Sequence, residues 1–521
     1  MTQRRRHASR GSGSGEPGGG FHRSGTRSSR RAHRSRGIAD GAFNAASKSF
    51  FIRNINAPSA SVLLLQALIV CCFLFGGSAR PEVVTQPFLR AAAALLLGAG
   101  LLSLRLEQVR SHWPLFGLMA ACIALPLAQL IPLPPGAANA LPGHGIVAAI
   151  DAQANLGALW RPLTVTPEAT RNALWSLLIP CAALVLAVQI PEERYKSIAR
   201  LVLGMGLIAG VLGLLQILGD SNGPLYFYDT TNNGSAVGLF ANRNHQAVFL
   251  ACLLPLMFAA FDLRDSGGGE ANPTRQHRLL ARNVKQAIAA SAALFLMLLI
   301  IVTGSRAGLA IGVLGFACTP FVVSGRSRSS DGASRRQARL ALMLSCAVIG
   351  IVVALAVWMH RAVALDRLLS SDAAEEMRLR ILPTVKTITQ SFWPWGSGLG
   401  SFEKIYQVNE PADLLTSAYM NHAHNDWLEL AMTGGLPALV LVLLAVVFWL
   451  AHAGKQAFSR GADRLSPLRK AGLIIVLLLA LASFTDYPLR TPALSCLLAL
   501  AAVWAALPAH ETSAAIRRAR S

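Results

Sequence analysis

The chain has 521 residues, of which 53% are hydrophobic and only 14% are charged. Soluble globular domains carry about 25% charged residues, so this composition excludes an ordinary soluble protein and indicates a membrane protein. The formal net charge is +22, from 48 Lys and Arg residues against 26 Asp and Glu residues. The eight cysteines lie in apolar stretches, which argues against a disulfide framework and against cysteine metal ligands.

Residues 1–56 form the first predicted segment, a basic tail rich in Gly, Ser and Arg. Its low apolar content predicts disorder, and it lacks the apolar core and the cleavage site of a signal peptide. Its charge is not accompanied by interleaved aromatic residues or by a known nucleic-acid-binding module, so we expect no nucleic acid partner. We expect the tail to fix the orientation of the chain and to contact anionic lipids.

About twelve apolar stretches follow, most of them close to the roughly 20 residues that a helix needs to cross a bilayer. They are 57–78, 88–104, 114–133, 172–190, 200–218, 245–262, 286–303, 307–324, 340–359, 427–452, 471–485 and 491–509. The sequence thus predicts an all-α polytopic integral membrane protein with about 12 transmembrane helices. We expect residues 57–509 to form one transmembrane domain and residues 510–521 to form a C-terminal tail.

Lys and Arg residues are concentrated in both tails and in alternate connections. Under the positive-inside rule, the two chain ends and these connections lie in the cytoplasm. The connections on the opposite, outer side are then 79–87, 134–171, 219–244, 304–306, 360–426 and 486–490. The longest of them, about 360–426, is predicted to be a large helical loop between the ninth and tenth spans.

The unusual polar clusters of the chain all fall on this outer side. They are "GLFANRNHQA" at 238–247, "TGSRAG" at 303–308, "EEMRLRILPTV" at 375–385, "NHAHND" at 421–426 and "TDYPLR" at 485–490. Several helices would therefore end at one surface that faces water. This arrangement predicts a site at the outer membrane surface rather than within the bilayer.

Each cluster allows more than one interpretation. Arg306 begins a span in a very short connection, and we interpret it as an anion-binding residue, although a snorkelling arginine would fit the same position. Arg378 and Arg380 lie on a predicted amphipathic helix, where arginines are commonly solvated. Asn244 and His245 could cap the sixth span.

The two histidines of "NHAHND" allow three roles. His422, His424 and Asp426 could supply three ligands to zinc from an extended segment. Either histidine could instead be a structural residue at the start of the next helix. We favour a general base, because a neutral imidazole titrates near physiological pH.

These clusters carry a family resemblance. "HAHNDWLELAMTGGLPAL" resembles the H-N-x-x-L-x6-G signature of the O-antigen ligase and O-antigen polymerase superfamily, with matches at His424, Asn425, Leu428 and Gly435. "GLFANRNHQAVFL" is similar to its G-x-F-x-N-x-N-H-x-A segment, and "TGSRAGL" is similar to its S-R-(G/A) turn at Ser305 and Arg306.

The large outer loop extends the resemblance. "MRLRILPTVKTITQSFWPWGSGLGSF" resembles the family's R-x-x-I-W…G-x-G-x-G-x-F stretch, with Leu382 in place of the usual Trp. "WRPLTVTPEAT" at 160–170 is similar to the proline-bearing stretch that precedes the next span. The resemblance covers about 160–440, and it rests on the order, spacing and shared side of the motifs.

The resemblance implies a metal-independent enzyme of a bacterial inner membrane, without a cofactor and with its active site facing the periplasm. Its donor would be an undecaprenyl-diphosphate-linked glycan, and its acceptor lipid A-core or another glycan, as a ligase or a polymerase. A flippase for the same lipid-linked glycan and a protein O-oligosaccharyltransferase are the alternatives.

The resemblance also implies roles for individual residues. His424 would be the catalytic base, and Arg306 and Arg378, with Arg243 and Arg380 as further candidates, would bind the donor diphosphate. The supporting residues would be Asn425 and Asp426, which would orient the imidazole, together with His422, Asn244, His245 and Ser305.

Overall fold

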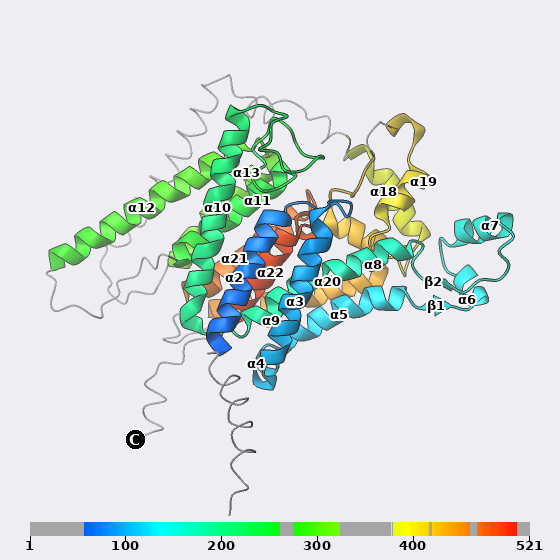
Figure 1. The fold of residues 1–521 in the computed structure, drawn as a ribbon, viewed down its shortest axis with the longest axis horizontal. Coiled ribbons are helices and arrows are strands. Elements are labelled where there is room, and N and C mark those ends of the chain that lie inside the picture. The colour runs from blue at the N-terminus through cyan, green and yellow to red at the C-terminus, as the bar shows by residue number, and fades with distance from the viewer. Residues whose placement is uncertain are drawn as a thin grey trace, which may run out of the picture. The chain divides into compact units, whose positions relative to one another are not determined.

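The computed structural model describes residues 57–260, 275–323, 377, 379–415, 419–458 and 466–507 (Figure 1). Four predicted features lie outside the described residues: the disordered tail 1–56, the ninth span 340–359, Arg378 and the C-terminal tail 510–521. The described residues are mainly helical, with one short ribbon in which β1 (Pro132–Leu133) pairs antiparallel with β2 (Arg161–Pro162).

The helices follow the apolar stretches closely. They are α2 (Ala57–Phe75), α3 (Thr85–Ser103), α4 (Leu106–Ser111), α5 (Trp113–Gln129), α6 (Pro135–Asn139), α7 (Gly145–Gln153), α8 (Pro167–Ser176), α9 (Leu178–Ala187), η1 (Glu192–Arg194), α10 (Tyr195–Leu218), α11 (Arg243–Ala260), α12 (Arg275–Val302), α13 (Arg306–Ala317), α14 (Thr319–Val323), α18 (Leu382–Ser391), α19 (Phe402–Asn409), η2 (Ala412–Leu414), α20 (Asp426–Phe458), α21 (Pro467–Ala482), η3 (Pro488–Arg490) and α22 (Pro492–Ala505). Every predicted span except 340–359 coincides with helical residues.

Four of these helical stretches are long and apolar enough to cross a membrane, by length and composition. They are Thr85–Ser103, Pro167–Ala187, Glu192–Leu218 and Asp426–Gly454. Shorter apolar helices accompany them. The prediction of an all-α membrane protein is thereby confirmed, whereas the number of twelve spans stays a prediction.

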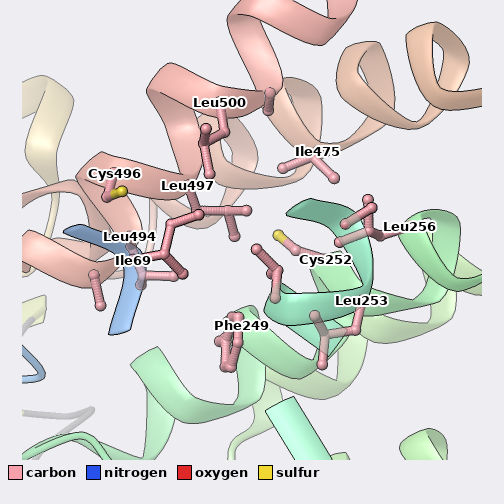
Figure 2. Close-up of a cluster of buried hydrophobic side chains, with 14 of the residues drawn as sticks. Ile69, Phe249, Cys252, Leu253, Leu256, Ile475, Leu494, Cys496, Leu497 and Leu500 are labelled. Carbon is pink, nitrogen blue, oxygen red and sulfur yellow. The ribbon is translucent and has the colours of Figure 1, made fainter. Parts of the chain in front are cut away.

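Helix α11 lies at the centre of the transmembrane core. It is buried along almost its whole length and packs against α10, α12, α13 and α21. In Figure 2, Phe249, Cys252, Leu253 and Leu256 of this helix lie among apolar side chains of α2, α21 and α22. Because all faces of α11 are covered, the position of its N-terminal residues is fixed by the whole bundle.

Small residues allow helices to approach α10 closely. A Cβ atom on Gly206 would lie 2.0 Å from Cδ1 of Leu253 in α11, and one on Gly210 would lie 2.5 Å from Cδ1 of Leu299 in α12. The two glycines are one turn apart, the small-xxx-small spacing that brings helices together in lipid. Packing of this kind is needed in a membrane because lipid tails are as apolar as leucine side chains.

The segment between α18 and α19 is attached to a break in α20. Gly435 has a φ of 60° and a ψ of −155° inside α20, a conformation open mainly to glycine. The backbone N–H of Leu436 donates to the carbonyl of Pro394 at 2.8 Å, and the N–H of Gly398 donates to the carbonyl of Thr433 at 2.9 Å. The glycine of the family signature therefore marks the place where the large outer loop joins the helix that follows His424.

The stretch 160–170 packs against the same junction. The backbone N–H of Val165 donates to the carbonyl of Ser397 at 3.0 Å, and the hydroxyl of Thr170 donates to the carbonyl of Leu399 at 2.8 Å. Gln129, at the end of α5, donates to the carbonyl of Thr433 at 3.1 Å and accepts from the N–H of Leu399 at 2.9 Å. Two motif segments that are far apart in the sequence thus meet beside α20, together with Gln129 of α5.

Candidate functional site

His424 lies one residue before the cap of helix α20. Its φ is 50°, a left-handed conformation that is uncommon outside glycine but tolerated by histidine. Asn425 caps the helix, because its Oδ1 accepts a hydrogen bond from the backbone N–H of Leu428 at 3.0 Å. The Nδ1 atom of the His424 ring lies 3.0 Å from Oδ1 of Asp486, in the α21–α22 connection.

Asp486 is 2% exposed and accepts from several donors. Its Oδ2 accepts from the side-chain amides of Asn242 and Asn244 at 3.2 and 2.7 Å, and its Oδ1 accepts from the backbone N–H of Tyr487 at 3.0 Å. Both oxygens thus act as acceptors, as in an ionised carboxylate. The bond to His424 therefore places the hydrogen on Nδ1, and in the neutral ring Nε2 is the nitrogen that can accept a proton.

Tyr487 brings three histidines together. The centroid of its ring lies 4.4 Å from that of His422, 4.9 Å from that of His424 and 5.0 Å from that of His245. His245 is buried in the first turn of α11, with Nε2 3.9 Å from Oδ1 of Asp486. The aromatic ring thus packs between histidines from two helix starts.

A buried ionic network lies beside the histidines. Nε of Arg490 lies 2.9 Å from Oδ1 of Asp426, and its Nη1 lies 3.1 Å from Oε1 of Glu429. Glu429 also accepts from the backbone N–H of Ala423 at 2.9 Å, and Oε1 lies 3.1 Å from Nδ1 of His422. Asp426 and Glu429 therefore hold Arg490 and His422, whereas the ring of His424 is oriented by Asp486.

Two residues of this network, His422 and Arg490, lie outside the predicted spans, and their surroundings shift their pKa values. Burial lowers the pKa of His422 below its ordinary value, although the nearby Glu429 carboxylate acts in the opposite direction. Burial also acts to lower the pKa of Arg490, but Glu429 and Asp426 outweigh it and raise that pKa overall. At neutral pH the network thus combines a neutral His422 with a charged Arg490.

A cavity of about 470 Å³ lies next to His424. Its lining includes most of the residues expected at the site: Arg243, Asn244, His245, Ser305, Arg306 and His424. In volume it falls within the range of small-molecule sites in proteins.

Two helices begin at this cavity. Asn242 caps α11 by accepting from the backbone N–H of Asn244 at 2.8 Å, and Ser305 caps α13 by accepting from the N–H of Gly308 at 2.9 Å. Helix N-termini carry a partial positive charge, which adds to the guanidinium groups of Arg243 and Arg306. The cavity is therefore suited to an anion.

The other expected site residues lie elsewhere or outside the described residues. Arg380 is half exposed and forms an ion pair with Asp413 at 3.2 Å on the outer loop, while Arg378 is not described. Among the described side chains, no group of three His, Cys, Asp or Glu residues has the arrangement of a metal site.

Sequence reasoning did not assign roles to Asp486, Tyr487 or Arg490. All three belong to the "TDYPLR" cluster, which had been noticed only as polar residues on the outer side. The available signal was the presence of two charged residues, Asp486 and Arg490, in a very short connection between two predicted spans. Arg80, in the α2–α3 connection, lines the cavity as well, and no motif pointed to it.

Comparison with known proteins bears on the family. No curated protein matches the chain. Residues 291–443, a stretch that contains Arg306, His424 and Gly435, match the family model described as O-antigen ligase. The resemblance predicted from the sequence is thereby confirmed over this stretch of the chain.

Proposed function

We propose that the protein transfers a glycan from an undecaprenyl-diphosphate carrier to an acceptor hydroxyl at the periplasmic face of a bacterial inner membrane. The match to the O-antigen ligase family supports a glycan transfer reaction at a membrane. The observation that carries the proposal is the pairing of His424 with Asp486 on a cavity that also contains Arg243 and Arg306. One cavity then offers a base and an anion site.

The reaction proceeds by attack of the acceptor hydroxyl on the anomeric carbon of the donor sugar. The new glycosidic C–O bond forms, the bond between the anomeric carbon and the phosphate oxygen breaks, and undecaprenyl diphosphate leaves. His424 takes the hydroxyl proton at Nε2, and Asp486 stabilises the imidazolium that results. A positioned base of this kind contributes about 10²–10⁴-fold to the rate.

The leaving diphosphate gains negative charge as the bond breaks. Guanidinium groups remain charged at any working pH and match phosphate oxygens in pairs, so Arg243 and Arg306 stabilise that charge. The N-terminal ends of α11 and α13 act in the same direction. We assign the same role to Arg378 because the family resemblance implies it and because its neighbour Met377 lines the cavity. Fixed cations of this kind replace a metal ion in the proposed mechanism.

The proposed orientation puts the cavity on the periplasmic side, with both chain ends in the cytoplasm and about 12 spans in between. The basic residues of the tails and alternate connections support this orientation. A long lipid-linked glycan would reach the cavity from the bilayer, while the acceptor hydroxyl would come from lipid A-core or from a second glycan.

Glycan profiling of a deletion strain tests the proposal. The strain is complemented with wild type, His424→Ala, Arg306→Ala or the surface variant Arg171→Ala, and the amount of each protein in the membrane is checked. We expect the first two variants to abolish glycan extension or attachment and the third to restore it. Accumulated single lipid-linked units indicate a polymerase, and accumulated long lipid-linked chains indicate a ligase. Normal glycans in both site variants contradict the proposed site.

A further inference from the structure

Arg80 lies in a connection whose backbone is fixed on three sides. The carbonyl of Gly77 accepts from the N–H of Ala241 at 3.1 Å, and the N–H of Gly77 donates to the hydroxyl of Tyr228 at 2.9 Å. The side-chain amide of Gln86 donates to the carbonyl of Ser78 at 2.9 Å. A Cβ atom at Gly77 would lie 2.0 Å from a carbonyl oxygen, so this approach requires glycine. The base of the Arg80 side chain is therefore well positioned.

The guanidinium of Arg80 is held at the cavity by two side chains. Its Nη1 donates to Oε1 of Glu82 at 3.1 Å and to the hydroxyl of Tyr419 at 2.5 Å. The guanidinium carbon also lies 4.9 Å from the centre of the Tyr419 ring. Tyr419 in turn donates to Glu82 at 2.8 Å. The three residues link the α2–α3 connection to the segment that leads into His424.

This arrangement leaves hydrogen-bonding capacity for a ligand. The arginine side chain has five N–H donors, and within the described part of the chain both side-chain hydrogen bonds of Arg80 come from Nη1. The Arg80 side chain is 18% exposed, while its partner Glu82 is 53% exposed. An ion pair with an exposed carboxylate is weak, so a phosphate group of higher charge can compete with it.

Arg80 shares its cavity with both described arginines of the proposed anion site. The cavity is lined by Arg80, Arg243, Arg306 and His424 together. Arg80 and Tyr419 come from two connections that are 339 positions apart in the sequence. A ligand that fills the cavity therefore contacts the α2–α3 connection as well as the helix starts at 243 and 306.

We propose that Arg80 is a further binding residue for the donor diphosphate, held ready by Tyr419 and Glu82. This inference rests on the proposed function. When the donor binds, the remaining N–H groups of Arg80 donate hydrogen bonds to phosphate oxygens. The hydrogen bond between Arg80 and the exposed Glu82 carboxylate is then broken. Tyr419 keeps the guanidinium plane in place during this exchange.

Donor titration with purified protein tests the role of Arg80. We expect Arg80→Ala to raise the KM for the lipid-linked donor about ten- to hundredfold, the effect of losing hydrogen bonds to a charged group. The kcat should fall by a smaller factor than the KM rises, because the interaction is already present in the bound donor and strengthens only in part as the diphosphate gains charge. Arg80→Lys should give an intermediate KM. Arg171→Ala, on the exposed face of α8, is the matched control and should leave both constants unchanged.

A direct binding measurement separates this inference from the proposed function. Undecaprenyl diphosphate alone is titrated against His424→Gln and against the His424→Gln, Arg80→Ala double variant. We expect the same tenfold or larger difference in Kd between them. Equal Kd values, or a normal KM with a reduced kcat, overturn the role of Arg80 and leave the proposed function in place. If neither variant binds undecaprenyl diphosphate, the proposed donor is wrong and the role of Arg80 falls with it.

Discussion

Replacement of Asp486 by Asn tests how His424 is made a base. Among the described residues, Oδ1 of Asp486 accepts from His424 and the backbone N–H of Tyr487, and Oδ2 accepts from Asn242 and Asn244. An asparagine offers an acceptor at only one of these positions. With its NH2 group toward His424, it also faces the backbone N–H of Tyr487 and favours the imidazole tautomer whose hydrogen is on Nε2. With the opposite orientation, it faces two amide donors, and the imidazolium loses its counter-charge.

Both orientations weaken the base, so we expect kcat to fall by about 10²–10⁴-fold. At about 1.36 kcal/mol for each factor of ten, this corresponds to about 3–5 kcal/mol of transition-state stabilisation. The donor KM should change little, because Arg243 and Arg306 are left in place. The assay is the initial rate of transfer from a defined lipid-diphosphate glycan by detergent-purified protein, with the melting temperature measured in parallel.

Two comparisons decide whether Asp486 acts through His424. The double variant His424→Gln, Asp486→Asn should be no slower than His424→Gln alone, since residues that act as one unit lose activity together. The control Asp413→Asn removes an exposed carboxylate of the outer loop and should leave kcat unchanged. A kcat for Asp486→Asn within about threefold of the wild type refutes the reasoning, as does a double variant in which the two losses multiply.

Three further predictions concern the support of the site. Glu429→Gln leaves Arg490 buried beside one carboxylate fewer, so it should lower the free energy of unfolding by about 3–5 kcal/mol, read as a loss of thermal stability in detergent. Gly435→Ala should cost at least about 1–3 kcal/mol, because its φ is 60° and a Cβ atom there would lie 2.2 Å from the carbonyl oxygen of Pro394. Gly454→Ala, in the same helix with open space at its Cβ, is the control and should not lower the melting temperature; equal melting temperatures for the two variants would contradict this argument. Burial lowers the pKa of His422 in the folded protein, so the unfolded chain binds more protons below about pH 6.5. The wild type should therefore lose more stability than His422→Gln between about pH 7.5 and about pH 5. Equal losses of stability in the two proteins would contradict this prediction.

The helices could be predicted from the sequence because hydropathy alone decides which stretches enter a bilayer. Apolar stretches such as 200–218 and 245–262 coincide with α10 and α11. Hydropathy does not say which helix is central, and the burial of α11 on all sides follows from its packing. Gly435 could also be matched to the family signature from the sequence. The need for a glycine there comes from a contact with Pro394, which lies 41 positions earlier in the chain.

The candidate site was only partly predictable, because some of its contacts join residues that are far apart in the sequence. His424 and Arg306 follow from motifs that are local in the sequence. Asp486 lies 62 positions after His424, and it reaches the imidazole only because α21 and α22 pack beside the start of α20. The family resemblance implied that Asn425 and Asp426 orient the imidazole. In the structure the start of a helix uses Asn425 as a cap, and Asp426 faces Arg490.

The connection between α21 and α22 has a larger role than its length indicates. Asp486 holds the ring of His424, and Arg490 holds Glu429, which in turn binds His422 and the backbone at Ala423. One short connection therefore fixes both His424, the proposed base, and the residues before it.

The segment between α18 and α19 is attached farther along α20. Its backbone hydrogen bonds with α20 are at Met432, Thr433 and Leu436, about two to three turns beyond His424. Ala423, the residue before His424, packs in one apolar cluster with Ile381 and Phe402, so the outer loop also borders the candidate base. The left-handed backbone of His424 is therefore held on two sides, because Asp486 binds its ring and Glu429 binds the backbone N–H of Ala423.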